Sequence, residues 1–182
     1  MSATEDLLQD HIFIRRLHVV IEKCYTQLRE GKKIPIVDLV KIADIIEQFV
    51  DQFHHGKEEN SYFPKTESKG AYSEEIRKFV IEHEFGRRIA RRVRIHLEEL
   101  LQGKDTREPL ARYLKTYSVF ILDHTSKEDS FFMRVKEKQS LSEEEERMLK
   151  EQFNCMKLEC LRKGSSNLIQ ILRQLESADW AR

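Results

Sequence analysis

Four long segments of this 182-residue chain carry apolar side chains every three or four residues. A helical turn holds 3.6 residues, so this spacing gathers the apolar side chains on one helical face. The predicted helices cover residues 4–31, 35–64, 73–101 and 105–132, with Thr4 as the cap of the first. No segment alternates apolar and polar residues as a half-buried strand does. Four such helices with short connections predict an all-α fold, an up-down-up-down four-helix bundle.

A further helix is predicted after these four. Ser140 or Ser142 begins it, and the four glutamates at 143–146 suit the positive end of a helix dipole. Its apolar residues continue toward Trp180, with an interruption expected at Gly164-Ser165-Ser166. We therefore expect residues 1–138 to form the bundle and residues 139–182 to form a C-terminal helical extension that packs on it.

The charge balance and the composition narrow the classes of partner. Lys and Arg together number 32, as do Asp and Glu, so the zero net charge predicts neither nucleic acid nor a membrane surface as the main partner. No apolar run approaches the ~20 residues that span a bilayer. The acidic N-terminus lacks the features of a signal peptide, and three cysteines without a CxxC pair argue against a disulfide framework. We expect a soluble, cytoplasmic protein.

Each of the four predicted helices places a histidine on its apolar face, namely His11, His54, His83 and His124. His54 and His124 are each followed four residues later by a glutamate, Glu58 and Glu128, one turn along the same face. A buried carboxylate beside a buried imidazole is costly unless a cation pairs with it. Four imidazoles and two carboxylates could hold two metal ions with the carboxylates bridging. Such donors suit iron best, with zinc or manganese as substitutes.

The register of the second helix has an alternative. His55 and Glu59 repeat the spacing of His54 and Glu58, but on an α-helix the two pairs face about 100° apart. The apolar residues just before them favour His54 as the inward histidine; these are Phe49, Val50 and Phe53. We therefore prefer His54 and Glu58 as ligands and expect His55 and Glu59 to be solvated or to contact the ligands from outside.

Four pieces of the chain, DHIFIRRL, HHGKEENSYFP, EHEFGRR and DHTSKED, together span residues 10–129 and resemble the hemerythrin-like (HHE cation-binding) family. The resemblance implies a non-haem di-iron centre in a four-helix bundle, bridged by carboxylates and by an oxo or hydroxo group. It implies bridging roles for Glu58 and Glu128 and terminal nitrogen ligation by the remaining predicted ligands, His11, His54, His83 and His124. Oxygen-carrying hemerythrins have a further histidine on the third helix, where this chain has Arg87. The chain looks more like the six-ligand HHE proteins, which include bacterial iron–sulfur-cluster repair proteins.

Five other residues are candidates for supporting roles around the ligands. Arg15 and Arg87 each follow a predicted ligand by one turn, where they could pair with carboxylates or extend to the surface. Tyr62 and Tyr117 are expected in the core, with a hydrogen bond to a bridging oxygen as the alternative. His18 follows His11 by two turns, and we expect a hydrogen-bonded core histidine, with a substitute ligand as the alternative.

These patterns lead to an expectation about function. We expect binding of O2, NO or peroxide at the metal pair, with a role in oxidative or nitrosative stress response or in iron handling. One alternative is an iron-dependent regulatory or sensing module, because metal binding and folding are linked. The other is a di-iron redox enzyme that reduces NO or decomposes peroxide, which needs an electron donor that the motifs do not name.

Overall fold

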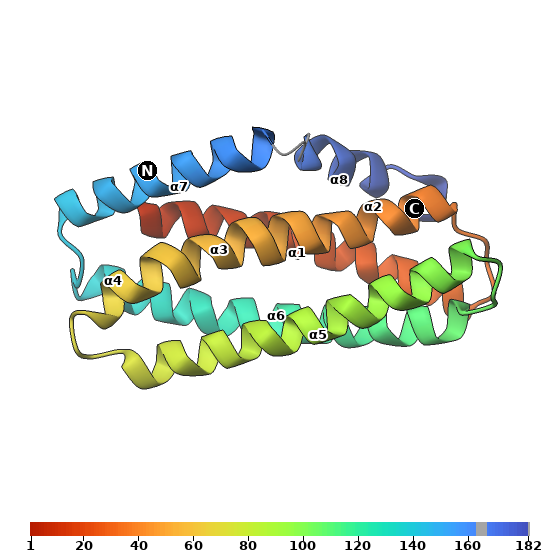
Figure 1. The fold of residues 1–182 in the computed structure, drawn as a ribbon, viewed down its shortest axis with the longest axis horizontal. Helices are drawn as coiled ribbons and strands as arrows, with labels where there is room; N and C mark the ends of the chain where they lie inside the picture. Colours follow the sequence, from red (N-terminus) through yellow and green to blue (C-terminus); the bar gives the residue numbers. More distant parts are fainter. Residues whose placement is uncertain (163–166, 182) are drawn as a thin grey trace.

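The computed structural model describes residues 1–162 and 167–181, and every regular element in this part of the chain is helical (Figure 1). The three uninterrupted long helices of the bundle are α1 (Ala3–Arg29), α5 (Ser73–Leu101) and α6 (Arg107–Glu137). The remaining rod, here called the segmented helix, joins five consecutive helical pieces: α2 (Ile36–Ile45), η1 (Ile46–His54), α3 (His55–Lys57), η2 (Glu58–Tyr62) and α4 (Phe63–Glu67).

The four rods close into a bundle in chain order. The segmented helix contacts α1 and α5, and α6 contacts α5 and α1. Each rod therefore lies beside the rods that precede and follow it in sequence, and the segmented helix is diagonal to α6. This arrangement confirms the predicted all-α bundle (Figure 1).

The ends of α1 follow from local chemistry. Ser2, rather than the predicted Thr4, caps the helix: its hydroxyl accepts the Glu5 N–H, and the Glu5 carboxylate accepts the Ser2 N–H. The helix stops before Gly31, whose φ of 73° lies in the left-handed region that glycine adopts without strain. Thr4 is thus free to use its hydroxyl elsewhere.

The segmented helix departs from α-geometry around the HHGKEE stretch. η1 and η2 are π-helical, so a backbone N–H donates to the carbonyl five residues earlier, and each turn holds more residues than an α-turn. Consecutive side chains therefore lie less than 100° apart around the axis. Short π-helical stretches are frequent at functional sites.

The apolar core of the bundle is divided in two. One cluster includes Leu17 of α1 and Leu114 of α6, and the other includes Leu7 of α1 and Phe131 of α6. On every rod, the residues between these two clusters include the predicted ligands. The bundle thus contains a polar layer between two apolar ones.

The C-terminal extension consists of α7 (Glu143–Arg162), α8 (Leu168–Glu176) and the short η3 (Asp179–Ala181). It lies along α1 and the segmented helix (Figure 1). Leu149 and Phe153 of α7 join one core cluster, and Leu172 and Leu175 of α8 join the other. The predicted interruption at Gly164-Ser165-Ser166 lies outside the described residues, and the division at residue 138 stays a prediction. None of the described helices has the length and apolar character of a membrane span.

Candidate metal centre

A layer of ionisable side chains crosses the bundle between the two apolar clusters. All four rods contribute to it, and each contributing side chain is fully buried. The layer contains the six predicted ligands together with one further imidazole: His11, His54, His55, Glu58, His83, His124 and Glu128. Residues that are up to 117 positions apart in sequence therefore meet at one level of the bundle.

His55 departs from the sequence interpretation. Of the two alternatives given for it, solvated or in contact with the ligands from outside, the solvated one is wrong, because the His55 ring is buried and stacks on the His83 ring with centroids 3.8 Å apart. The ring of His124 lies 5.8 Å away. The π-helical turns of the segmented helix explain the difference, since they bring His54 and His55 to the inner side together. The doubled histidine was the available signal, and the assumption of α-geometry hid it.

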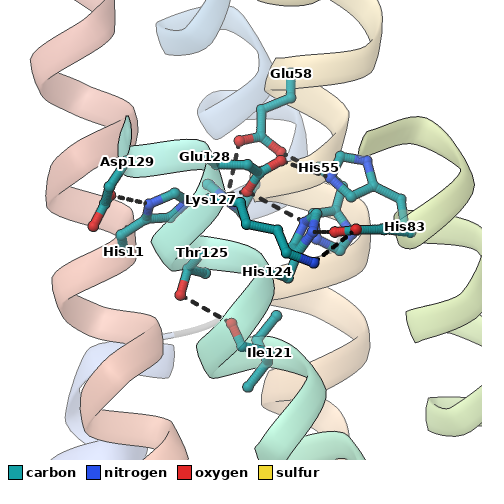
Figure 2. A network of polar contacts seen from close by, with 12 residues as sticks. His11, His55, Glu58, His83, Ile121, His124, Thr125, Lys127, Glu128 and Asp129 are labelled. Atoms are coloured by element: carbon teal, nitrogen blue, oxygen red, sulfur yellow. Dashed lines mark hydrogen bonds and ion pairs between the residues drawn. The ribbon is translucent and has the colours of Figure 1, made fainter. Parts of the chain in front are cut away.

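The ligand atoms of these residues fall into two groups. The three-histidine group contains His55, His83 and His124, and the second group contains His11 and His54 with the two glutamates. Within each group the ligand atoms lie within 4.8 Å of one another. Figure 2 shows His11 on one side of Glu58 and Glu128, with His55, His83 and His124 on the other.

Glu58 reaches both groups. Its Oε1 lies 3.3 Å from Nε2 of His54, and its Oε2 lies 3.4 Å from Nε2 of His83. Two donors bound at about 2.1 Å to one cation, with perpendicular bonds, are about 3 Å apart. The observed separations therefore have the scale of donors that share a cation.

Glu128 spans the groups in the same way. Its Oε1 lies 3.1 Å from Nε2 of His83. Its Oε2 lies 3.2 Å from Nε2 of His124 and 3.4 Å from Nε2 of His11. Both glutamates thus contact imidazoles of the two groups at once.

Several of the inward-facing atoms have no hydrogen-bond partner among the described residues. They are both carboxylate oxygens of Glu58, Oε2 of Glu128, and Nε2 of His55 and of His124. A buried polar atom without a partner costs about 1–3 kcal/mol. Metal ions bound among these atoms would satisfy them together, so the residues present fit a metal centre.

Each of the five histidines also faces a carboxylate on its outer nitrogen, Nδ1. The pairs and their separations are His11–Asp129 at 2.6 Å, His54–Asp10 at 3.2 Å, His55–Asp51 at 3.4 Å, His83–Glu59 at 2.7 Å and His124–Glu82 at 2.8 Å. At every one of these histidines except His55, the Nδ1 atom is hydrogen-bonded to its carboxylate, which favours the tautomer whose Nε2 is free to bind a metal and fixes the ring orientation. Nδ1 of His55 has no hydrogen-bond partner among the described residues. The sequence interpretation named Glu59 but missed the other four, which mostly reach their histidine from a neighbouring helix.

Cations hold four of these five carboxylates. Arg15 pairs with Asp129, and Nη2 of Arg87 lies 2.7 Å from Glu59, so both arginines contact carboxylates that support histidines. Two lysines that the sequence interpretation missed complete the set: Lys57 pairs with Asp10, and Lys127 lies 3.0 Å from Glu82. Among the described residues no cation pairs with the remaining acid, Asp51, and burial raises its pKa to about 7.

The remaining predicted residues make contacts elsewhere in the core. The Tyr62 hydroxyl shares a 2.7 Å hydrogen bond with the Thr4 hydroxyl, so it is held away from the metal layer. Nδ1 of His18 lies 2.8 Å from the Ser118 hydroxyl, so the expected hydrogen bond is present, although the side chain is only partly buried. Tyr117 is fully buried, and its hydroxyl has no hydrogen-bond partner among the described residues.

Gly86 lies one turn from His83 and allows a close helix contact. A Cβ at this position would lie 2.6 Å from Cε1 of Phe120 on the neighbouring α6. The Phe120 ring in turn stacks on the His124 ring at 5.3 Å. The glycine therefore makes room for the aromatic ring that stacks on His124.

In the absence of metal, the pKa values of the buried histidines and glutamates are shifted in directions that favour the binding of a cation. Burial lowers the pKa of His54 to about 4, and burial together with His83 holds the pKa of His55 well below its ordinary value. Burial and the neighbouring Glu128 raise the pKa of Glu58 well above its ordinary value. Burial opposes the charged form of His124 as well, but Glu128 and Glu82 outweigh it and raise that pKa to about 9.

Comparison with known proteins gives the class of this chain. Residues 2–135 match the family described as hemerythrin HHE cation binding domain, and the chain belongs to this family. The match confirms the resemblance that the four sequence pieces indicated. The buried histidines and glutamates are the candidate cation site of that domain.

The individual curated proteins that match the chain carry no functional description in their names. Uncharacterized proteins from Mycobacterium bovis and from two strains of Mycobacterium tuberculosis are 25% identical to the chain over 131 residues. The aligned region covers 71% of this chain and 51% of each relative, so the chain spans about half the length of these curated relatives. No solved structure matches the chain.

Proposed function

We propose that this bundle holds two metal ions, one at each ligand group, with Glu58 and Glu128 as bridges. The observation that carries the proposal is the span of Glu58, whose two oxygens lie 3.3 Å and 3.4 Å from Nε2 atoms of His54 and His83, in different groups. A bridging carboxylate needs this arrangement, and bundles that hold metal pairs use inward glutamates and histidines in the same way. The proposal includes His55 as a fifth histidine ligand.

Iron is the metal that these donors suit best. The proposed set consists of imidazole nitrogens and carboxylate oxygens, a combination that iron, manganese and zinc accept. Zinc or manganese would be substitutes. Elemental analysis combined with the visible spectrum separates the three, since an oxo- or hydroxo-bridged ferric pair absorbs visible light and a zinc pair is colourless.

The two proposed metal positions differ in the number of protein donors. The three-histidine group offers three imidazoles and the other group two, while both glutamates reach each group. The position at His11 and His54 therefore has room for an external ligand. Two ferrous ions, if bound here, would supply the two electrons that O2 or peroxide accepts, and NO would bind at the same position. The apolar clusters on both sides keep bulk water out of the layer.

We therefore propose a di-iron protein that binds O2, NO or peroxide, with a role in oxidative or nitrosative stress or in iron handling. Stopped-flow mixing of the di-ferrous protein with each of the three molecules tests this function. We expect an optical change that saturates at one small molecule per chain. Repeated turnover with a reductant would instead favour a redox enzyme, and no reaction with any of the three would contradict the proposal.

One feature favours a second function, iron-dependent regulation. The proposed donors come from all four rods, so bound metal would tie the whole bundle together. The free energy of metal binding then adds to the stability of the fold. We expect a clearly higher melting temperature with iron than with a chelator, and equal melting temperatures would count against this second function.

A further inference from the structure

Lys57 is a buried lysine in the middle of the HHGKEE stretch. Its side chain is 0% exposed, although lysine is almost never fully buried unless it is paired. Its Nζ lies 2.7 Å from Oδ1 of Asp6 and also pairs with Asp10, both on α1. The surroundings are aromatic, with Nζ 4.5 Å from the centroid of Phe53 and 5.1 Å from that of Phe153.

Through Asp10, the lysine is connected to a proposed metal ligand. Oδ2 of Asp10 pairs with Lys57 and also lies 3.2 Å from Nδ1 of His54. Lys57 therefore fixes the carboxylate that orients the His54 ring, whose Nε2 faces the centre. His54 belongs to the group with fewer histidines, so the orientation of its ring matters most there.

Lys57 differs in exposure from the three other cations that pair with carboxylates behind the histidines. The side chains of Arg87, Arg15 and Lys127 are 27%, 37% and 48% exposed, so solvent screens their ion pairs. The side chain of Lys57 is buried and its ion pairs are screened much less. Removing this charge should therefore affect its histidine more than removing an exposed one.

The C-terminal extension covers Lys57 and one of the acids beside it. The Phe153 ring over Nζ comes from α7, and Lys150 of α7 pairs with Asp6, the other acid beside Lys57. Phe153 itself is buried in the same core cluster as Leu149. Residues 143–162 lie outside the region that matches the family, so this cover is an addition to the shared domain.

We propose that Lys57 is a positioning residue for His54. We also propose that α7 supports this role, because its Phe153 covers the ammonium group of Lys57. This inference rests on the proposed metal pair. The extension thereby controls how firmly the metal at His11 and His54 is held, while the metal at the three-histidine group is held without its help. Loss of the Phe153 ring admits water to Nζ, which screens the pairing with Asp10 and loosens the orientation of His54.

The test uses the full chain loaded with ferrous iron and compares Lys57→Met and Phe153→Leu with the unchanged protein. The matched control is Lys127→Met, which removes the exposed lysine of the equivalent contact with Glu82. The measurement is the rate at which each of the two irons passes to a strong chelator. A merely structural role would change the melting temperature or release both irons alike.

We expect both variants to release one of the two irons faster, by about 10-fold. Loss of a group that contacts a ligand costs about 10–100-fold in metal affinity, and Lys57 acts one contact further out, through Asp10. The second iron should leave at the unchanged rate. Lys127→Met should change either rate by less than about fivefold, as an exposed ion pair does.

The outcomes separate this inference from the proposed function. An unchanged protein that binds no metal would overturn the proposed function itself. Two irons in the unchanged protein, with unaltered release in Lys57→Met and Phe153→Leu, would overturn only the role of Lys57 and α7. If Lys57→Met does not fold, Phe153→Leu decides, because leucine keeps most of the apolar volume and removes only the ring over Nζ.

Discussion

The imidazole rings of His55 and His83 stack 3.8 Å apart, with only 16° between their planes, although the residues belong to different rods of the bundle. Two rings this close cannot both carry a charge cheaply in a buried layer. Burial and the neighbouring His83 accordingly hold the pKa of His55 well below its ordinary value. His55 is therefore neutral at physiological pH, and neutral imidazole is the form that binds metals.

The first prediction concerns His55 as a ligand. Replacement by alanine should reduce the iron content from two per chain toward one, because the three-histidine group would lose a third of its imidazoles. The matched control is His18→Ala, which removes a core histidine held by Ser118 and should leave the iron content unchanged. Full iron content in His55→Ala would contradict the assignment of His55 and return the site to six ligands.

The second prediction concerns Glu58→Gln in the absence of metal. Burial and Glu128 make the charged form of Glu58 costly, so a neutral amide should stabilise the metal-free protein by about 1 kcal/mol at pH 8. The same change should abolish binding of the metal pair, because an amide is a poor bridge. Urea unfolding with a chelator measures the first effect and elemental analysis the second. Glu59→Gln is the control, and it should not stabilise the protein, since Glu59 is paired with His83 and Arg87.

The third prediction concerns the pH dependence of the metal-free protein. Despite its burial, His124 has a pKa raised to about 9 by Glu128 and Glu82, against about 6.5 in the unfolded chain. Its ion pairs therefore stabilise the fold fully below about pH 6.5, and this stabilisation is lost as the pH rises through 9. We expect the free energy of unfolding to fall by roughly 2 kcal/mol over this window.

Metal should reverse this trend. A bound ion takes the place of the proton on His124, so raising the pH from 6.5 to 9 should strengthen binding and stabilise the loaded protein. Urea unfolding at several pH values, with iron and with a chelator, measures both trends. A metal-free protein that becomes more stable over this range would contradict the proposed pairing of His124.

The fourth prediction concerns Gly86. Alanine gains about 1 kcal/mol in helix propensity, but its Cβ would lie 2.6 Å from Phe120 and force that ring away from His124. We expect Gly86→Ala to destabilise the protein by about 1 kcal/mol overall. In a Phe120→Ala background the same change should become stabilising, since the clash is gone. Equal effects in both backgrounds, measured by urea unfolding, would exclude the contact as the reason for glycine.

The sequence was sufficient for the bundle and for most of the candidate site. The period of the apolar residues gives the four rods, and a histidine on each apolar face places His11, His54, His83 and His124 in one layer. His55 was missed because whether it faces inward depends on π-helical hydrogen bonds, which the residue pattern does not reveal. Asp129 was missed for another reason: it reaches His11 from a different helix, and sequence spacing carries no information about that contact.

Lys57 was missed because its contacts, like that of Asp129, come from other helices. In the motif HHGKEE a lysine followed by two glutamates resembles a solvated side chain, and the structure buries it completely. Its burial depends on Asp6 and Asp10 of α1, which are 51 and 47 residues away in sequence, and on Phe153 of α7, which is 96 residues away. Contacts of this kind follow from the tertiary arrangement, so only a structure could supply them.

The central claim is that the layer holds a pair of metal ions bridged by Glu58 and Glu128. Anaerobic titration of the metal-free protein with ferrous iron, followed by oxidation and a visible spectrum, tests it most directly. We expect a titration that breaks at two irons per chain and the absorption of a bridged ferric pair. A break at one iron per chain, or no uptake, would contradict it.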